Sequence, residues 1–175
     1  MNLGNRRLTN EELRGHFEAI GLADVASFRA SGNVVFSASR QRSARGLEQL
    51  IAAELEKLLG YPVQTFVRTA EELCEIAATE PFDEASRSRL KGKAQVMLLA
   101  ARPGAAARRK ALALAGDQDE LVFGPRELHW LPAGGLSESK LDMRALEQTL
   151  GPVTVRTHGT IEQIAARWFE RSRGT

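Results

Sequence analysis

The chain has a single cysteine, Cys74, among its 175 residues, which excludes an internal disulfide and any metal site built from several cysteines. No apolar run approaches the roughly 20 residues that a membrane-spanning helix needs. The N-terminal residues also lack the apolar stretch of a signal peptide. We therefore expect a cytoplasmic protein with no membrane association.

An excess of charge of either sign is also missing. Lys and Arg number 24 against 22 Asp and Glu, so the formal net charge is only +2. This balance excludes a histone-like basic arm and an acidic disordered tail as main features. Apolar residues make up 43% of the chain, which is ordinary for a folded domain. The length suits one domain of common size or two small halves.

The first half shows clear helix and strand signals. Thr9 and Thr69 are each followed three residues later by Glu, the capping-box pattern of a helix start. Strand-forming residues on both sides of Ser31-Gly32 predict a β-hairpin. Leucines at helical spacing and then alternating valines predict a helix and a strand. The predicted elements are a helix, two strands, a helix, a strand and a helix, over residues 9–20, 25–30, 33–38, 43–59, 62–68 and 69–78.

The second half follows residues 79–93, the longest polar stretch and the best linker candidate. The apolar run Gln95–Ala101 predicts a central strand that is buried on both faces. Ser137 is the expected N-cap of the second helix that follows. The later elements are a helix, two strands, a helix, a strand and a last helix, over residues 105–114, 120–123, 127–131, 137–150, 152–156 and 160–171.

The order of elements predicts the fold. Residues 95–156 read β-α-β-β-α-β, the ferredoxin-like order, and the first half reads the same without its first strand. We therefore predict an α+β fold of two ferredoxin-like βαββαβ subdomains, a duplication whose first copy lacks its first strand. The first subdomain covers residues 1–78, the linker 79–93, and the second subdomain, with a C-terminal helix, 94–175.

The absent strand is central in this arrangement, so Pro62–Arg68 would lack its neighbour and leave backbone donors unpaired. Two explanations stay open. The native chain starts upstream of Met1, which we favour, or another segment or chain fills the gap, which would make the protein a homo-oligomer.

Four short motifs resemble one protein family. Asn2-Leu3-Gly4-Asn5 before the capped helix, Ser31-Gly32-Asn33-Val34-Val35-Phe36 and Ser139-Lys140-Leu141 are similar to segments of the domain-of-unknown-function 1697 family. Arg156-Thr157-His158-Gly159-Thr160 stands where that family tends to have Arg-Asn-Trp-Asn-Thr. The upstream strand of the family and its Arg-Gly are absent from this sequence. The resemblance implies an α+β fold of two subdomains in uncharacterised bacterial proteins, and it brings no established activity.

The polar motifs shared with that family are all expected at turns or helix starts. Ser31-Gly32-Asn33, preceded by Arg29, is either a backbone nest that presents polar side chains to a ligand or ordinary hairpin chemistry. Ser139-Lys140 is either an anion contact or a solvated helix start, since neighbours on a helix point about 100° apart and form no dyad. Arg156–Thr160 either grips phosphate or includes an N-cap at Thr160 that needs no ligand.

Three functional hypotheses follow. The first is a binding protein for a small anionic or phosphate-containing molecule, with a cleft between two subdomains lined by Arg29, Ser31, Asn33, Lys140, Arg156 and Thr160. The second is an enzyme of unknown reaction on a phosphorylated or acidic substrate, although no nucleophile and base stand at useful spacing. The third is a nucleic-acid or protein interaction module that uses basic clusters. The scarcity of aromatic residues, 6%, disfavours nucleic acid without excluding it.

No cofactor is expected. The three histidines show no metal-ligand spacing with one another or with the cysteine.

Overall fold

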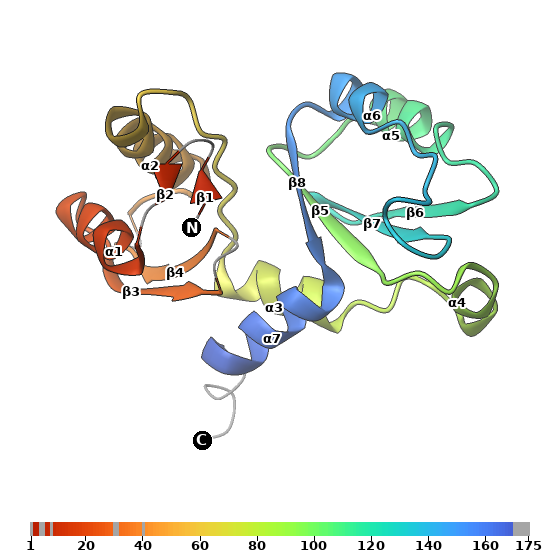
Figure 1. The fold of residues 1–175 in the computed structure, drawn as a ribbon, viewed down its shortest axis with the longest axis horizontal. Coiled ribbons are helices and arrows are strands. Elements are labelled where there is room, and N and C mark those ends of the chain that lie inside the picture. Colours follow the sequence, from red (N-terminus) through yellow and green to blue (C-terminus); the bar gives the residue numbers. More distant parts are fainter. Residues whose placement is uncertain (1, 4–5, 8, 30–31, 40, 170–175) are drawn as a thin grey trace. The chain divides into compact units, whose positions relative to one another are not determined.

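The computed structural model describes residues 2–3, 6–7, 9–29, 32–39 and 41–169. The chain divides into two compact units, Met1–Val67 and Arg68–Thr175. Each unit combines helices with antiparallel strands, so the predicted α+β class is confirmed (Figure 1).

The boundary between the units lies within the segment predicted as the last strand of the first subdomain. The helix that follows it, α3 (Ala70–Ala78), packs against α7 (His158–Trp168) in the second unit. The polar stretch 79–93, expected to be a linker, contains the helix α4 (Glu84–Leu90). Phe82 and Leu90 are buried there with Leu131, so this stretch belongs to the core of the second unit.

The first unit joins two amphipathic helices to a β-hairpin. Its elements are β1 (Asn2–Leu3), β2 (Arg6–Arg7), α1 (Asn10–Ala19), β3 (Ala23–Phe28), β4 (Asn33–Ser37) and α2 (Ala44–Leu59). Helix α1 begins at the predicted capping box, in which Thr9 Oγ1 accepts the Glu12 N–H at 3.2 Å. Helix α2 ends at Gly60, whose φ of 81° lies in the left-handed region that glycine favours. The core of the unit is made of Leu13, Phe17, Leu22, Leu47, Ile51, Leu55, Leu59 and Val67.

The strand predicted over Pro62–Arg68 does not form. This segment joins no sheet among the described residues, since a strand forms only where a second backbone pairs with it. The N–H of Val67 donates instead to Glu48 Oε1 at 2.8 Å. Val63 and Val67 still pack against the core of the unit, so the alternation of valines correctly predicted which side of the segment faces inward.

The second unit contains a four-stranded antiparallel sheet in the order β6-β7-β5-β8. Its strands are β5 (Gln95–Leu99), β6 (Asp119–Phe123), β7 (Glu127–Pro132) and β8 (Val153–Thr157), and α5 (Ala105–Leu112) and α6 (Met143–Leu150) join α3, α4 and α7 as its helices. Strand β5 lies between β7 and β8 and is buried along its whole length, as its continuous apolar run predicts.

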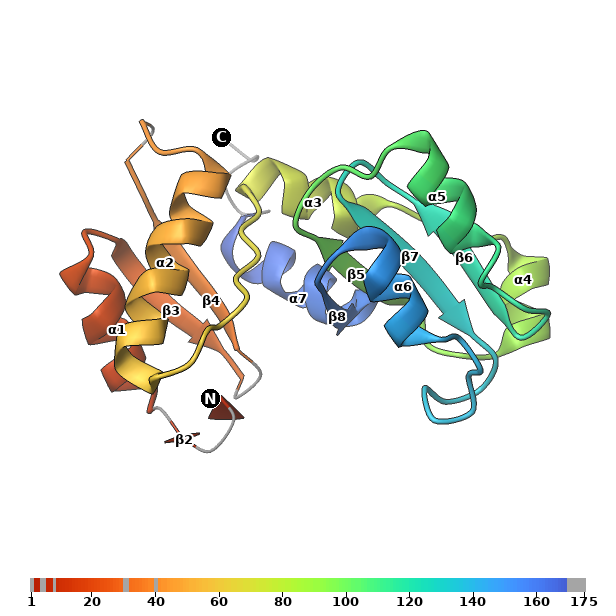
Figure 2. The same ribbon diagram turned by 90° about the horizontal axis from the view of Figure 1, so that it is seen from above.

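The register of the strands sorts the side chains onto two faces. Met97, Leu128 and Trp130 lie on one face and pack with Leu146 of α6. On the other face, Val96 of β5 lies between His129 of β7 and Arg156 of β8. Figures 1 and 2 show α5 and α6 on one side of the sheet. Helices α3, α4 and α7 lie on the other side in Figure 1.

The helix predicted to start at Ser137 begins at Met143, so that prediction is wrong by more than one turn. The N-cap is Asp142, whose side chain accepts an N–H of the first turn at 2.9 Å. The physical reason lies in the preceding loop. The Ser139 hydroxyl donates to the buried Asp119 carboxylate at 2.7 Å and accepts a backbone N–H at 3.0 Å, which holds the loop out of the helix.

Candidate functional site

The end of β8 runs directly into α7, and this junction collects the polar residues of the 156–160 motif. Thr157 is the N-cap of α7, and its Oγ1 accepts the Thr160 N–H at 3.2 Å. The two threonine hydroxyls lie 2.8 Å apart. The helix predicted to start near Thr160 therefore begins two residues earlier, at His158, and Thr160 lies in its first turn.

Arg156 stands one residue before this cap, on the edge strand β8. Its Nη1 donates to Thr154 Oγ1 and to the Val155 carbonyl, each at 2.8 Å. The side chain is half-buried, and burial lowers the pKa of the guanidinium. These bonds anchor the arginine side chain to its own strand, one to two residues before the junction.

His158 connects three elements at the start of α7. Its backbone N–H donates to the Ala94 carbonyl at 2.9 Å, just before β5. Its Nε2 lies 3.1 Å from the Ile76 carbonyl in the last turn of α3, and its Nδ1 lies 3.5 Å from Glu162 Oε1. An N–H on Nε2 fits the contact with Ile76, because a carbonyl oxygen can only accept. The ring is thereby fixed with little freedom to rotate.

His129 is the buried neighbour of His158 that sequence reasoning did not connect with the motif. The two ring centroids lie 6.3 Å apart. Burial, and to a lesser degree the neighbouring His158, lowers the pKa of His129 to about 4. The β-α-β-β-α-β order could have predicted this contact. In that fold only β5 separates β7 from β8, and α7 starts at the end of β8.

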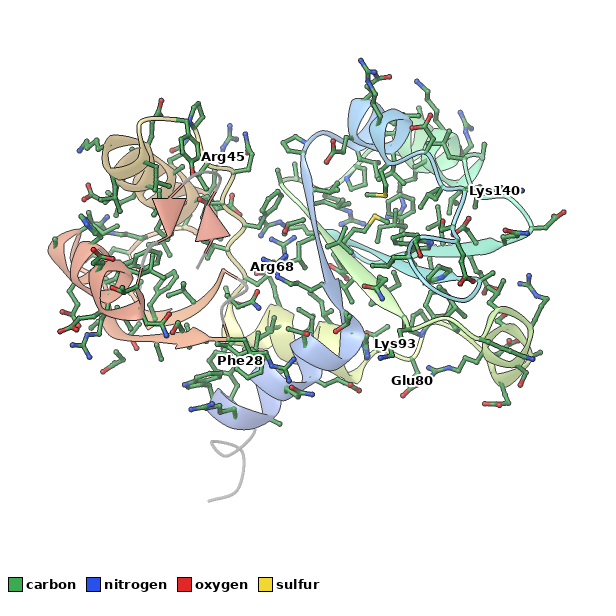
Figure 3. All side chains as sticks on the ribbon, viewed as in Figure 1. Phe28, Arg45, Arg68, Glu80, Lys93 and Lys140 are labelled. Atoms are coloured by element: carbon green, nitrogen blue, oxygen red, sulfur yellow. The ribbon has the colours of Figure 1, made fainter. Side chains whose placement is uncertain are left out.

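Lys93 adds a second cation at the same end of the sheet. It lies two residues before β5, and the β5–β8 register sets Gln95 opposite Thr157. The Gln95 side chain donates to the Lys93 carbonyl at 2.8 Å, which fixes the backbone there. Figure 3 shows the Lys93 side chain beside the start of α7. Lys93 and Arg156 thus belong to two neighbouring chain segments that meet where the His158 N–H bonds the Ala94 carbonyl.

Lys140 lies in a different part of the second unit. It is exposed in the loop before α6, next to the serine that bonds Asp119 (Figure 3). Trp130 Nε1 also donates to Asp119, at 2.7 Å, so this carboxylate belongs to the face opposite Arg156. Strands β6 and β8 form the two edges of the sheet. The structure therefore brings Arg156 and Thr160 to one junction and keeps Lys140 away from it.

The remaining predicted site residues belong to the first unit. Arg29 follows the last residue of β3 with a left-handed φ of 56°, and its guanidinium lies 5.0 Å from the centroid of the Phe28 ring. Asn33 opens β4 opposite Phe28. Ser31 lies outside the described residues. Arg29 and Asn33 lie on either side of the hairpin turn. They belong to the first unit, whereas the α7 junction belongs to the second.

Two further properties bear on the chemistry of the site. Within the described ranges, no three His, Cys, Asp or Glu side chains gather as they would around a metal ion. No helix in the same ranges has the length and apolar character needed to cross a bilayer. Fold and junction together define an α+β protein of two units whose second unit carries a basic strand-to-helix junction.

The sequence profile of the DUF1697 family, described as proteins of unknown function, matches residues 1–129. The chain belongs to this family, which confirms the family resemblance; the motifs at residues 2–5 and 31–36 lie within the matched residues, and those at 139–141 and 156–160 lie outside them. The match covers the first unit and ends at His129, so β8 and α7 lie outside the matched residues.

A solved structure of a conserved bacterial protein from Streptococcus pneumoniae is similar to the chain with a TM-score of 0.63 and 19% sequence identity. The likeness covers 95% of this chain and 92% of the other. At this identity the likeness concerns the fold alone. A comparison with proteins of curated function finds no match.

Proposed function

We propose that the protein binds a small anionic molecule, with a phosphate or carboxylate group, at the junction of β8 and α7. The observation that carries the proposal is the placement of Arg156, a half-buried cation, directly before the N-cap of α7. Burial disfavours the charged form of this group, and an anion bound beside it would favour that form again. Binding would therefore draw its free energy partly from relief of that penalty.

The first turn of α7 supports the same ligand chemistry. The His158 N–H donates to Ala94 and the Thr160 N–H to the Thr157 hydroxyl. Within the described residues the N–H of Gly159, between them, has no acceptor. This donor lies at the positive end of an 11-residue helix, where anions are stabilised. The Glu162 carboxylate lies close to this glycine, with Oε2 3.6 Å from the place that a Cβ at residue 159 would take.

The proposal uses the second unit alone. Arg156 supplies a fixed cation, Lys93 a mobile one, and Gly159 a backbone donor, while Thr160 keeps the first turn in place through Thr157. Lys140, Arg29, Ser31 and Asn33 stay outside it. An anion is favoured over a neutral ligand because Arg156 and Lys93 carry positive charge and the Gly159 N–H is a hydrogen-bond donor.

Thermal unfolding with added anions tests the proposal. Inorganic phosphate, sulfate and AMP are compared with chloride at matched ionic strength, and Trp fluorescence reports the second unit, which holds both tryptophans, Trp130 and Trp168. A specific ligand raises the unfolding temperature progressively with its concentration. Chloride at the same ionic strength should give no such rise.

Two variants make the test specific. Arg156→Gln removes the fixed cation and should abolish the rise, whereas Arg156→Lys should keep part of it. Arg109→Gln is the matched control, because Arg109 is exposed on α5 and its loss changes the net charge equally. Equal rises in R156Q and the unmodified protein, or no rise with any anion, would reject the proposal.

We further propose that the two units are copies of one βαββαβ arrangement. The series α1, β3, β4, α2 and residues 62–67 in the first unit follows the order of α5, β6, β7, α6 and β8 in the second. Residues 62–67 also turn Val63 and Val67 toward the core, as a paired strand would. In this proposal no described strand of the first unit corresponds to β5 of the second unit.

A further inference from the structure

The first unit has a hollow of about 450 Å³ between α1 and the β3–β4 hairpin. This volume falls within the range of roughly 300 to 1,000 Å³ that small-molecule sites occupy. The hollow is independent of the α7 junction, which belongs to the other unit. The residues that line it are Asn10, Glu11, Leu13, Arg14, Val25, Ser27 and Val34.

One part of the lining is apolar. Leu13 belongs to the buried core, and Val25 and Val34 pack against that core from the two strands of the hairpin. All three face the hollow as well. A ligand with an aliphatic group could cover these side chains and would gain the usual free energy of burying apolar surface.

The other part of the lining is polar and carries both signs of charge. Asn10, Glu11 and Arg14 come from the first turns of α1, and Ser27 comes from β3. Arg14 lies 3.6 Å from Glu18 in an exposed pair, which is weak enough for a ligand carboxylate to compete. Glu11 has no ion-pair partner among the described residues.

The capping box holds this polar rim in place. Thr9 N–H donates to Glu12 Oε2 at 2.8 Å, and the Glu12 carboxylate is thereby used within the protein. Glu11, the adjacent acid, is left to face the hollow. On the opposite wall, Ser27 pairs with Val34 across the hairpin, so a hydroxyl and an aliphatic group have fixed positions there.

We propose that this hollow binds a small zwitterion with an apolar side chain, the chemistry of an aliphatic α-amino acid. Arg14 pairs with the carboxylate, Glu11 with the ammonium group, and the side chain covers Val25 and Val34. A simple anion would meet the charge of Glu11, and a purely apolar ligand would desolvate both charged residues without compensation. A zwitterion satisfies both charges and the apolar wall at once.

Titration of the ¹⁵N-labelled protein with L-leucine tests the proposal. The backbone amide signals of Val25, Ser27 and Val34 should shift in a saturable way. Two compounds of the same carbon skeleton serve as controls: 4-methylpentanoate lacks the ammonium group, and 3-methylbutylamine lacks the carboxylate. Both should bind more weakly than leucine. Equal shifts with all three compounds, or no saturable shift with leucine, would overturn the proposal.

A pair of variants tests the role of Arg14. Arg14→Gln should weaken leucine binding by about twofold to fivefold, the effect of losing one exposed charge contact. Arg45→Gln is the matched control, since Arg45 is exposed on α2 and does not line the hollow (Figure 3). Arg14 is exposed, so the variant should fold as the parent protein does. Unchanged affinity in R14Q, or an equal loss in R45Q, would contradict the assignment.

Discussion

His129 of β7 and His158 of α7 lie with their ring centroids 6.3 Å apart beneath the start of the last helix. His129 is 2% exposed, and burial together with its neighbour lowers its pKa to about 4. His158 is tied to α3 through the Ile76 carbonyl. A proton on His129 would therefore place a buried positive charge against the residue that joins α3 to α7.

The stability of the second unit should accordingly decrease in acid. The unfolded chain takes up this proton near pH 6.5, but folded His129 does so only near pH 4. The stability that neutral His129 provides is thus complete above pH 6.5. It declines as the pH falls from there and is lost as the pH passes through about 4, a change of about 3 kcal/mol at most. Urea unfolding followed by Trp fluorescence between pH 4 and 8 measures it.

His129→Gln should remove this pH dependence, whatever its effect on stability at pH 8. His16→Gln, on α1 of the first unit, is the control and should leave the dependence unchanged. The same acid loss in H129Q as in the parent would show that another group is responsible.

Glu127, at the start of β7, should have the opposite dependence. Burial raises the pKa of this carboxyl, although the Arg126 N–H that it accepts at 3.0 Å lowers it in part. A raised pKa in the folded state means that its contribution is complete below the ordinary value of 4.5 and declines as the pH rises through the folded pKa. Glu127→Gln should therefore match the parent in acid and equal or exceed its stability at pH 8. A loss of more than about 1 kcal/mol at pH 8 would contradict this interpretation.

Asp119 should be a structural residue that fixes the loop before α6. One carboxylate oxygen accepts both Trp130 Nε1 and Ser139 Oγ at 2.7 Å. Ser139→Ala should cost about 1 kcal/mol, and Asp119→Ala about 3 kcal/mol because it leaves a buried indole N–H without an acceptor. Ser137→Ala, at an exposed position in the same loop, should change nothing. Urea unfolding gives the free energies, and a S139A variant as stable as the parent would remove this role.

Hydrogen exchange should distinguish the two units at their corresponding strands. Strand β7 pairs on both sides, with β5 and β6, whereas β4 pairs only with β3 in the described part of the chain. About half of the β4 amides should thus exchange quickly, and the β7 amides should be protected throughout. Uniform protection of β4 at the level of β7 would show that another strand pairs with its second edge. That result would reject the proposal that the first unit has no counterpart of β5.

The local signals in the sequence were accurate where neighbouring residues alone decide the conformation. The capping boxes at Thr9 and Thr69 form as predicted, because both partners lie within one turn of the helix. Gln95–Leu99 is the buried central strand, since only a strand enclosed on both faces tolerates a continuous apolar run. These features need no distant residue to form.

The departures arise where a distant residue decides. Pro62–Arg68 has the alternation of a strand, but a strand exists only if another backbone lies beside it. Ser137 has the chemistry of an N-cap, but Asp119 holds the following loop through Ser139 and delays the helix to Met143. In both cases a long-range effect outweighs the local conformational preference. At Pro62–Arg68 it is the lack of a pairing strand, and before α6 it is the hydrogen bond between Ser139 and Asp119.

The candidate sites divide in the same way. The sequence by itself determined the α+β class, the capped helix starts at Thr9 and Thr69, and the polar motif at Arg156–Thr160, because these depend on composition and short spacing. Only the tertiary structure placed His129 against His158, separated Lys140 from Arg156, and opened the hollow beneath Glu11 and Arg14. The physical reason is that a side chain's surroundings are set by which strands and helices pack together, and a single sequence does not state that pairing.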